Sequence, residues 1–282
     1  MTTPDLKSAY AHCRQLAFGH YENFPVASLL LPQPQRDAIA AIYAYARQAD
    51  DFADEAEFSK DKVRLLKAWM GKLQRPSQDP VFLALHDSIR RYRLPKSLLA
   101  DLVRAFLQDC HQARYRDFPQ VLAYCKLSAN PVGRLVLRVF GRDSAQACAQ
   151  SDAICTALQL ANHWQDLAKD VAQRDRFYLP QDEMERFGVR ESDLKAAVFT
   201  PALAELMRLQ VDRAEALFTQ GEALPGSLGG RLGLEVRLTL LGGRRILQKI
   251  RGQHYNTLGL RPKLGPGDGL GLVWGGLRGS LA

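Results

Sequence analysis

Two groups of acidic residues lie inside segments that are otherwise strongly apolar. The first group consists of Asp50, Asp51 and Asp54, and it follows an alanine-rich run at residues 38–46. Because that run has hardly any polar residue, it predicts a buried helix over about residues 35–57. Buried carboxylates carry a large desolvation cost unless a cation or a metal ion compensates them. We therefore expect these acids to act together with cations and an anionic ligand.

The spacing within this helix places a cation beside the acids. At about 100° per residue, Asp50 and Asp54 share one stripe with Tyr43 and Arg47, and Asp51 lies roughly 100° further round. A guanidinium in that position suits recognition of phosphate oxygens next to metal ions. The alternative is an arginine that is simply solvated.

The second group of polar residues also lies within an apolar segment and also has helical spacing. Gln159, Asn162, Asp166 and Asp170 recur three or four residues apart, which places them on one stripe of a second helix. Mg²⁺ prefers oxygen ligands and is typically held by one or two carboxylates together with substrate phosphates. Two such helices facing each other could hold a diphosphate between magnesium ions. One acidic stripe alone would more simply be a solvated helix face, but the pair within apolar runs is more specific.

Composition limits the class of protein and of partner. The chain has 282 residues, of which 46% are hydrophobic and 24% charged, so it is globular with ample core for one or two domains. A net charge of +8 suits nucleic acid, an anionic membrane or an anionic small substrate. We expect no nucleic-acid partner, because the sequence has no motif for one.

The sequence also predicts the compartment. It contains no run of about 18 apolar residues and no signal peptide, so we expect a cytoplasmic protein. Its five cysteines lack the spacing of a zinc site or a disulfide framework. From Arg231 to Lys263 the chain carries eight basic residues and one acid, Glu235. Such a basic last helix could contact lipid head groups at the inner face of the membrane, or could be a solvated helix face.

The pattern of helix, short break and helix recurs along the chain and predicts an all-α fold. Thr200 and Pro201, for example, read as an N-cap followed by proline at the first helical position, opening a helix to about Thr219. No linker or repeat divides the chain, so we expect a single helical domain over residues 1–263. Residues 264–282 are rich in glycine and are expected to be a disordered tail that could touch a membrane.

Several segments, in matching order, resemble the squalene/phytoene synthase family. The resemblance runs from about His20 to Arg251 and is carried by HYENFPVAS, YAYARQADDFAD, YCKLSANPVG, the second acidic group and RFYLP. It implies a trans-prenyl-synthase-type helical bundle with a deep central cavity, in which magnesium ions bind a prenyl diphosphate. Within the family, four segments are most similar in sequence to the bacterial hydroxysqualene synthase branch of hopanoid biosynthesis: ENFPVAS, SANPVG, NHWQD and GGRRILQKI.

That resemblance also implies roles for individual residues. The metal ligands would be Asp50, Asp51 and Asp54 on one wall and Asn162, Asp166 and Asp170 on the other. The diphosphate would be bound by Arg47, Arg176 and Tyr178, with His20 near the phosphates. The cavity would be lined by Tyr43, Tyr124, Gln159 and Phe24. Catalysis would depend on Asp50, Asp54, Asp166, Asp170, Tyr43 and Tyr124. Aromatic faces can stabilise a carbocation by roughly 1 to 2 kcal/mol each, although they could equally be plain core.

Gly243 marks a departure from the family pattern. In members that couple two prenyl diphosphates, a tyrosine of the last catalytic helix faces the cavity, whereas this chain has glycine at the corresponding place. Our hypothesis is that the missing ring leaves room for an attacking water, and the alternative is close helix packing.

Three functions are therefore considered. The first is ionisation of presqualene diphosphate followed by water capture, which gives hydroxysqualene. The second is head-to-head synthesis of squalene, dehydrosqualene or phytoene from farnesyl or geranylgeranyl diphosphate. The third is a non-catalytic assembly or lipid-binding protein, which has no need of buried acids.

Overall fold

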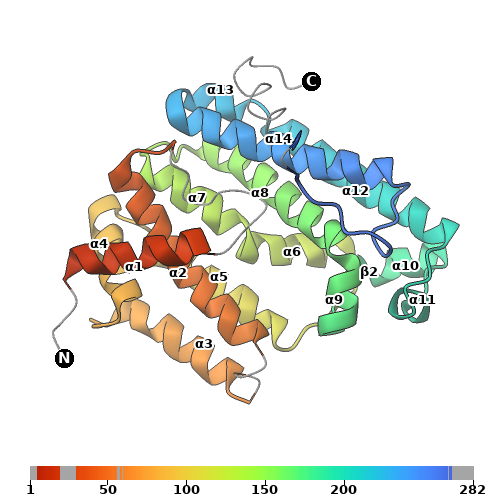
Figure 1. Cartoon of the computed structure of the whole chain (residues 1–282), viewed down its shortest axis with the longest axis horizontal. Coiled ribbons are helices and arrows are strands. Elements are labelled where there is room, and N and C mark those ends of the chain that lie inside the picture. The colour runs from red at the N-terminus through yellow and green to blue at the C-terminus, as the bar shows by residue number, and fades with distance from the viewer. Residues whose placement is uncertain (1–4, 20–29, 56–57, 59, 266, 269–282) are drawn as a thin grey trace. The chain divides into compact units, whose positions relative to one another are not determined.

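The structure of the protein is a computed structural model that describes residues 5–19, 30–55, 58, 60–265 and 267–268. Two residues expected in the site, His20 and Phe24, lie outside these ranges, as does most of the glycine-rich tail. The chain divides into two compact units. The first unit comprises Met1–His111 and Pro131–Cys148, and the second comprises Gln112–Asn130 and Ala149–Ala282. Both are helical, which confirms the all-α class (Figure 1). The domain boundary at residue 263 and the central cavity stay predictions.

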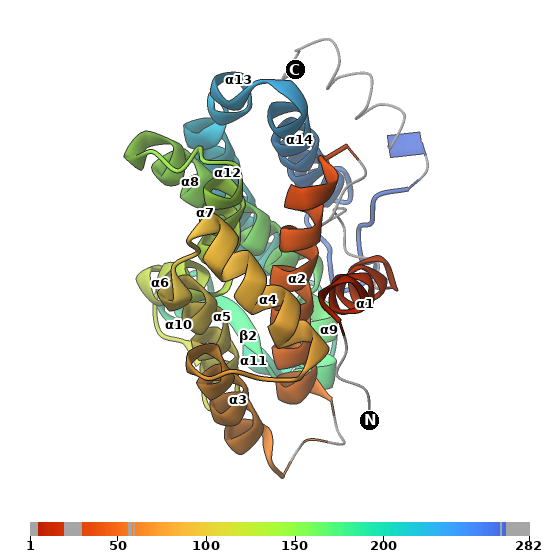
Figure 2. The same ribbon diagram turned by 90° about the vertical axis from the view of Figure 1, so that its left-hand side faces the viewer.

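The first unit is built around α2, the helix that carries the first acidic group. Its elements are α1 (Leu6–Gly19), α2 (Gln33–Asp54), α3 (Lys62–Gly71), the 3₁₀ helix η2 (Lys72–Gln74), α4 (Pro80–Tyr92), α5 (Lys96–Asp109) and nearly all of α7 (Asn130–Val139). Helices α1, α3, α4 and α5 all pack against α2, as Figure 2 shows for α1 and α4.

Helix α2 forms close to where the sequence predicts it. Pro34 lies in its first turn, where a missing backbone N–H has no cost. The helix ends at Asp54 because Glu55 adopts an extended conformation. Its buried side is lined by small alanines, so neighbouring helices can approach closely, and by Tyr45, which stacks on Trp69 with ring centroids 6.0 Å apart. Trp69 also donates its indole N–H to the backbone oxygen of Tyr45 at 3.1 Å, which fixes this part of α2.

The second unit carries the second acidic group. Its elements are β1 (Arg114–Tyr115), α6 (Phe118–Ser128), most of α8 (Ala145–Gln165), α9 (Leu167–Arg174), β2 (Phe177–Pro180), α10 (Gln181–Phe187), α11 (Glu191–Lys195), α12 (Pro201–Gly221), α13 (Leu224–Leu228) and α14 (Gly230–Gly252). Helix α12 begins as predicted, because the hydroxyl of Thr200 accepts a hydrogen bond from the backbone N–H of Leu203 at 3.1 Å.

Gly243 lies where α14 packs against α12 (Figure 1). A Cβ atom at this position would lie 2.4 Å from Cζ of Phe218 and 2.8 Å from Cδ2 of Leu158. The space beside Gly243 is therefore filled by buried side chains. This observation favours the alternative of close helix packing, and the hypothesis that Gly243 leaves room for water stays a prediction.

The second unit also contains a small pair of strands, which the all-α prediction did not include. Strands β1 and β2 pair in parallel, with Arg114 opposite Phe177. A strand of two residues is too short to show any alternation of polar and apolar residues, so the sequence gives no sign of it. Strand β2 carries Tyr178, one of the residues expected to bind the diphosphate.

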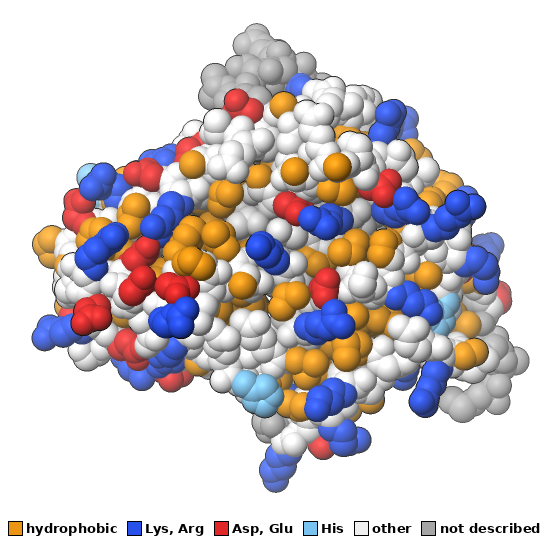
Figure 3. Space-filling view, turned by 180° about the vertical axis from the view of Figure 1, so that it is seen from behind, with side chains coloured by type: hydrophobic (Ala, Val, Ile, Leu, Met, Phe, Trp, Pro, Cys, Tyr) orange, Lys and Arg blue, Asp and Glu red, His pale blue; other side chains and the backbone are white. Residues whose placement is uncertain are grey.

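Surface charges are mixed in sign on the face seen in Figure 3, where Lys and Arg side chains alternate with Asp and Glu and with apolar groups. On that face the net charge of +8 is not gathered into one basic stripe.

Candidate active site

The first acidic group is organised by Arg47. This guanidinium lies 3.2 Å from Oδ2 of Asp50 and 2.7 Å from Oδ1 of Asp51, as expected for residues three and four positions apart on a helix. All three side chains are partly buried, with 25%, 34% and 19% of their surface exposed. Burial disfavours the charge on Arg47, but the two carboxylates outweigh burial and raise its pKa above the usual value.

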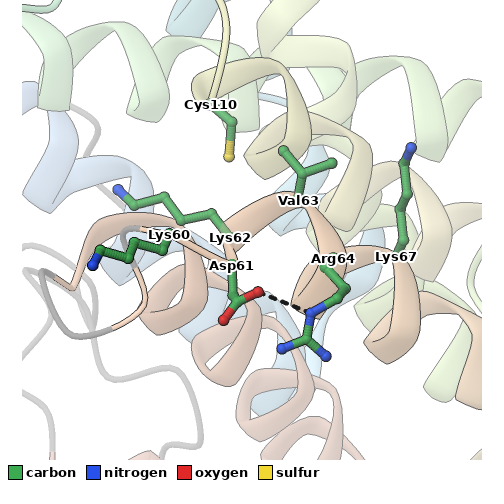
Figure 4. Close-up of a pocket in the computed structure, with 7 residues that line it drawn as sticks. All are labelled: Lys60, Asp61, Lys62, Val63, Arg64, Lys67 and Cys110. Atoms are coloured by element: carbon green, nitrogen blue, oxygen red, sulfur yellow. Dashed lines mark hydrogen bonds and ion pairs between the residues drawn. The ribbon is translucent and has the colours of Figure 1, made fainter.

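The end of α2 is held by a lysine that follows it. The ammonium of Lys62 donates a hydrogen bond to the backbone oxygen of Ala53, next to Asp54. Lys62 also lines a cavity of about 530 Å³ with the largely basic set Lys60, Asp61, Val63, Arg64, Lys67 and Cys110 (Figure 4). Asp61 is already paired with Arg64 at 2.9 Å. A cation near the C-terminal carbonyls of a helix is favourable, so Lys62 stabilises the turn that carries Asp54.

The second acidic group does not lie on one continuous helix as predicted. Helix α8 ends at Gln165, and Asp166 has φ −98° and ψ 10°, which starts α9 at a bend. The i to i+4 backbone bonds nevertheless continue across the bend, from Asp166 to Asn162 at 2.9 Å and from Asp170 to Asp166 at 2.8 Å. The predicted residues therefore remain neighbours, but the stripe changes direction at Asp166.

Asp166 is held by a residue that sequence reasoning missed. Arg261 donates from Nε to Oδ1 and from Nη2, at 3.0 Å, to Oδ2 of Asp166, which makes a bidentate pair. The hydrogen bond to Asp166 is the main reason that the pKa of Arg261 is raised. Beside it, buried Gln165 donates to the backbone oxygen of Pro262 at 2.6 Å. The chain after α14 thus returns to the second acidic group.

Asp170 is the most buried of the predicted metal ligands among the described residues. Its side chain is 10% exposed and pairs with Arg174 at 3.0 Å. Burial raises its pKa to about 6, although Arg174 acts in the opposite direction. After α9, Asp175 adopts the left-handed conformation with φ 48°, and the N–H of Arg176 donates to the backbone oxygen of Asp170 at 3.1 Å. This turn places Arg176 next to the second acidic group.

The second unit also contains a cluster of four rings, which we call the tyrosine–histidine cluster. It consists of Tyr115, Tyr124, His163 and Tyr178, all of them buried. The rings of His163 and Tyr178 stack with centroids 3.5 Å apart and planes at 17°. Tyr124 lies 5.9 Å from His163, and Tyr115 stacks on Tyr178 at 5.4 Å. The sequence predicted Tyr124 and Tyr178 in the site, but not Tyr115 or His163.

Charge reaches this cluster through Arg176, which is 9% exposed and donates to the hydroxyl of Tyr178 at 3.4 Å. Burial, and then the positive charge of Arg176, lower the pKa of His163 to about 3. The imidazole is therefore neutral at physiological pH, and Arg176 and Tyr178 form one polar unit beside it.

The remaining predicted residues lie on the expected helices. Tyr43 is half-buried on α2, and Gln159 and Asn162 are half-buried on α8. Because the two acidic groups belong to different units, their convergence on one diphosphate stays a prediction.

The two acidic groups offer the kind of oxygen ligands that Mg²⁺ prefers. No group of three or more acidic, histidine or cysteine side chains forms a ready metal cage within the described ranges. Mg²⁺ does not require one, because it is usually bound by one or two carboxylates and by substrate phosphates. Asp50 with Asp51, and Asp166 with Asp170, offer such carboxylates, and each now has an arginine as its cation. The residues present therefore fit Mg²⁺ bound together with an anionic substrate.

The chain belongs to the squalene/phytoene synthase family, whose sequence profile matches residues 18–268. It is similar to the hydroxysqualene synthase of Rhodopseudomonas palustris, with 35% identity over 235 residues that cover 82% of this chain and 80% of that protein. It is also similar to the 15-cis-phytoene synthase of Synechococcus elongatus, with 31% identity over 267 residues, or 89% and 87% of the two chains. Among solved structures, squalene synthase HpnC from Alicyclobacillus acidocaldarius has a TM-score of 0.84 and 38% identity, covering 89% of this chain and 96% of that one.

Proposed function

We propose that this chain is a hydroxysqualene synthase. In this reaction presqualene diphosphate loses its diphosphate, the cyclopropylcarbinyl cation rearranges, and water captures the cation to give hydroxysqualene. The observation that carries the proposal is the 35% identity to a hydroxysqualene synthase over 82% of the chain, together with both acidic groups held in place by arginines. The identity to a phytoene synthase is lower, at 31%.

Departure of the diphosphate is the step that the acidic groups serve. When bound, Mg²⁺ would act as a Lewis acid that stabilises the leaving diphosphate. Asp50, Asp51, Asp166 and Asp170 would hold the metal, because they are oxygen donors fixed by hydrogen bonds. Arg47, which pairs with Asp50 and Asp51, would bind the phosphate oxygens beside them, which a guanidinium recognises in a bidentate manner.

Protection of the carbocation is the step that the buried rings serve. Tyr124 and Tyr178 present aromatic faces inside the second unit, and such faces stabilise positive charge in a dry environment. Arg176 is held by the hydroxyl of Tyr178, which keeps its charge oriented beside the acids.

The test is to incubate the purified protein and Mg²⁺ with presqualene diphosphate and, separately, with farnesyl and geranylgeranyl diphosphate. Analysis of the products by mass should give hydroxysqualene from presqualene diphosphate. Product from farnesyl or geranylgeranyl diphosphate alone would contradict the proposal and favour the head-to-head synthases. No conversion of any of the three would favour the non-catalytic alternative.

We also infer that the protein makes peripheral contact with the inner face of an anionic membrane. This contact would be the route by which the hydrophobic product leaves. A cavity of about 520 Å³ lies along the end of α14 and is lined by Arg245, Gln248, Lys249, Gly252, Gln253, Leu260, Arg261, Pro262 and Lys263. Four basic residues and no acid line it, of which Arg245 and Lys249 pair with Asp268 and Arg261 pairs with Asp166. A basic residue near an anionic surface contributes about 1 kcal/mol, so these residues would attract a lipid surface to the extent that they exchange partners. Among the described residues, no helix combines the length and the hydropathy needed to cross a bilayer.

Sedimentation with vesicles tests this contact. The protein should sediment with vesicles that contain phosphatidylglycerol and not with neutral phosphatidylcholine vesicles. Equal binding to both kinds of vesicle, or to neither, would contradict the inference.

A further inference from the structure

One nitrogen in the tyrosine–histidine cluster has no hydrogen bond to account for it. Nε2 of His163 is fully buried and finds no hydrogen-bond partner within the described ranges. The residue as a whole is 4% exposed. A buried polar atom that stays unpaired costs roughly 1 to 3 kcal/mol, and such atoms in folded proteins usually have a water or a ligand as partner.

The position does not need a polar ring for packing. His163 stacks on Tyr178 with centroids 3.5 Å apart and nearly parallel planes. Its ring is tilted against Tyr124 and lies edge-on to Trp164, with centroids 5.9 Å and 6.2 Å away. A phenylalanine would make the same stack and would bury no unpaired nitrogen. The imidazole must therefore serve something other than the apolar contact.

The surroundings limit what Nε2 can bind. Tyr124 and Tyr178 lie against the imidazole, and Tyr115 packs against both of these rings. All three tyrosines carry hydroxyl groups, and a buried water needs two to four polar partners of this kind. Tyr124 and Tyr178 are also the rings expected to meet the substrate. A small neutral molecule with hydrogen-bonding capacity, which is to say water, fits this place.

We propose that Nε2 of His163 binds the water molecule that captures the carbocation. This inference rests on the proposed function and deepens it, because a site that excludes bulk water must hold the one molecule it uses. In this proposal His163 binds the attacking water, and no space beside Gly243 is needed, because Phe218 fills that space.

The chemistry balances without a further reactant. When the substrate ionises, the electron pair of its carbon–oxygen bond leaves with the diphosphate. A lone pair of the bound water then forms a new carbon–oxygen bond to the cationic carbon. One O–H bond of that water breaks, and the proton passes to the released diphosphate, which is the stronger base. No electron transfer takes place, and His163 only orients the water.

The experiment compares H163F with wild type in single turnovers of presqualene diphosphate, with H86F as the matched control. His86 also has a buried Nε2 without a partner in the described part of the chain, and it packs against Phe82 in the first unit. Substrate consumption and the fraction of product that is alcohol are measured by mass spectrometry. In H163F the ring can still stack on Tyr178, so the rate of substrate consumption reports on folding and ionisation, and the alcohol fraction reports on water capture.

The alcohol fraction of H163F should fall by about tenfold, the loss expected when one buried hydrogen bond is removed, and hydrocarbon formed by proton loss should rise. H86F should keep the wild-type fraction. An unchanged alcohol fraction in H163F would overturn the inference. If wild type itself forms no alcohol, the proposed function fails instead, so the two failures are distinguishable.

A crystal structure of the wild-type protein provides a second measurement that does not depend on how H163F folds. It should show a water about 2.6 to 3.2 Å from Nε2. A side chain of the protein bound to Nε2 at that distance would overturn the inference. H163Q, which restores a polar group at this place, should recover part of the alcohol fraction, and no recovery in a folded H163Q would count against a role for Nε2.

Discussion

Replacing Gly243 with alanine tests whether this glycine serves helix packing. The new Cβ atom would lie 2.4 Å from Cζ of Phe218 and 2.8 Å from Cδ2 of Leu158. Phe218 is fully buried, so its ring cannot move into solvent. Overpacking of this kind typically costs about 1 to 3 kcal/mol.

Helix propensity acts in the opposite direction. Alanine is favoured over glycine within a helix by about 1 kcal/mol. The two effects together should lower the free energy of unfolding of G243A by on the order of 1 kcal/mol. For a chain of this size, that corresponds to a melting temperature about 2 to 4 °C below wild type.

Two other glycines of α14 provide the comparison. A Cβ at Gly252 would meet no atom within 4 Å, so G252A should be stabilised by up to about 1 kcal/mol. A Cβ at Gly233 would lie 2.4 Å from the backbone oxygen of Pro225, which yields less readily than a ring edge, so G233A should lose more stability than G243A. Thermal melts and urea titrations give the order. If G243A melts at or above wild type, the packing explanation of Gly243 is refuted.

Three further predictions concern the acidic groups. D166N should lower kcat by a factor of about 10² or more, as the loss of one electrostatic stabiliser does. The control D212N, which changes an acid paired with Arg251 on the surface, should keep the wild-type kcat. Equal kcat values for the two variants would contradict the role of Asp166. Chelation with EDTA should abolish diphosphate release and added Mg²⁺ should restore it, and release that persists without metal would exclude the metal mechanism. In the metal-free protein, the pKa of Asp170 is raised by burial to about 6 from the usual 3.8, so the native state binds its proton more tightly than the unfolded chain. Ionised Asp170 therefore costs stability in full above about pH 6, and the cost disappears as the pH falls to about 3.8. D170N should gain up to about 3 kcal/mol more over wild type at pH 8 than at pH 4 in urea titrations, and a gain independent of pH would refute this reasoning.

Helix ends could be predicted because their signals are local. Thr200 and Pro201 start α12 in the sequence and in the structure, since a cap and a proline act on the residues next to them. Helix α2 was expected over residues 35–57 and spans Gln33–Asp54, so its location was correct and its ends shifted by two or three residues.

Features that depend on distant residues could not be predicted. Arg261 pairs with Asp166 across 95 positions of the chain, and nothing near either residue signals the partner. The bend at Asp166 was missed because regular helical spacing continues through the sequence, although the backbone turns there. The tyrosine–histidine cluster draws its members from β1, α6, α8 and β2, so no periodicity in the sequence reveals it.

The cations that the acidic groups require turn out to be arginines of the chain itself. The sequence predicts that cations or metal ions compensate the buried carboxylates, and it places Arg47 beside the first group, but it indicates no arginine partner for the second group. In the structure Arg47 compensates Asp50 and Asp51, Arg261 compensates Asp166, and Arg174 compensates Asp170. An acid left unpaired in a buried place would be strongly destabilising. Because arginine partners offset part of that cost, and for Asp170 only part, the acidic groups can fold before any metal or substrate arrives. In the proposed function, the carboxylates and the guanidiniums would then already be in place for Mg²⁺ and a diphosphate, and each charged group would only need to change its partner.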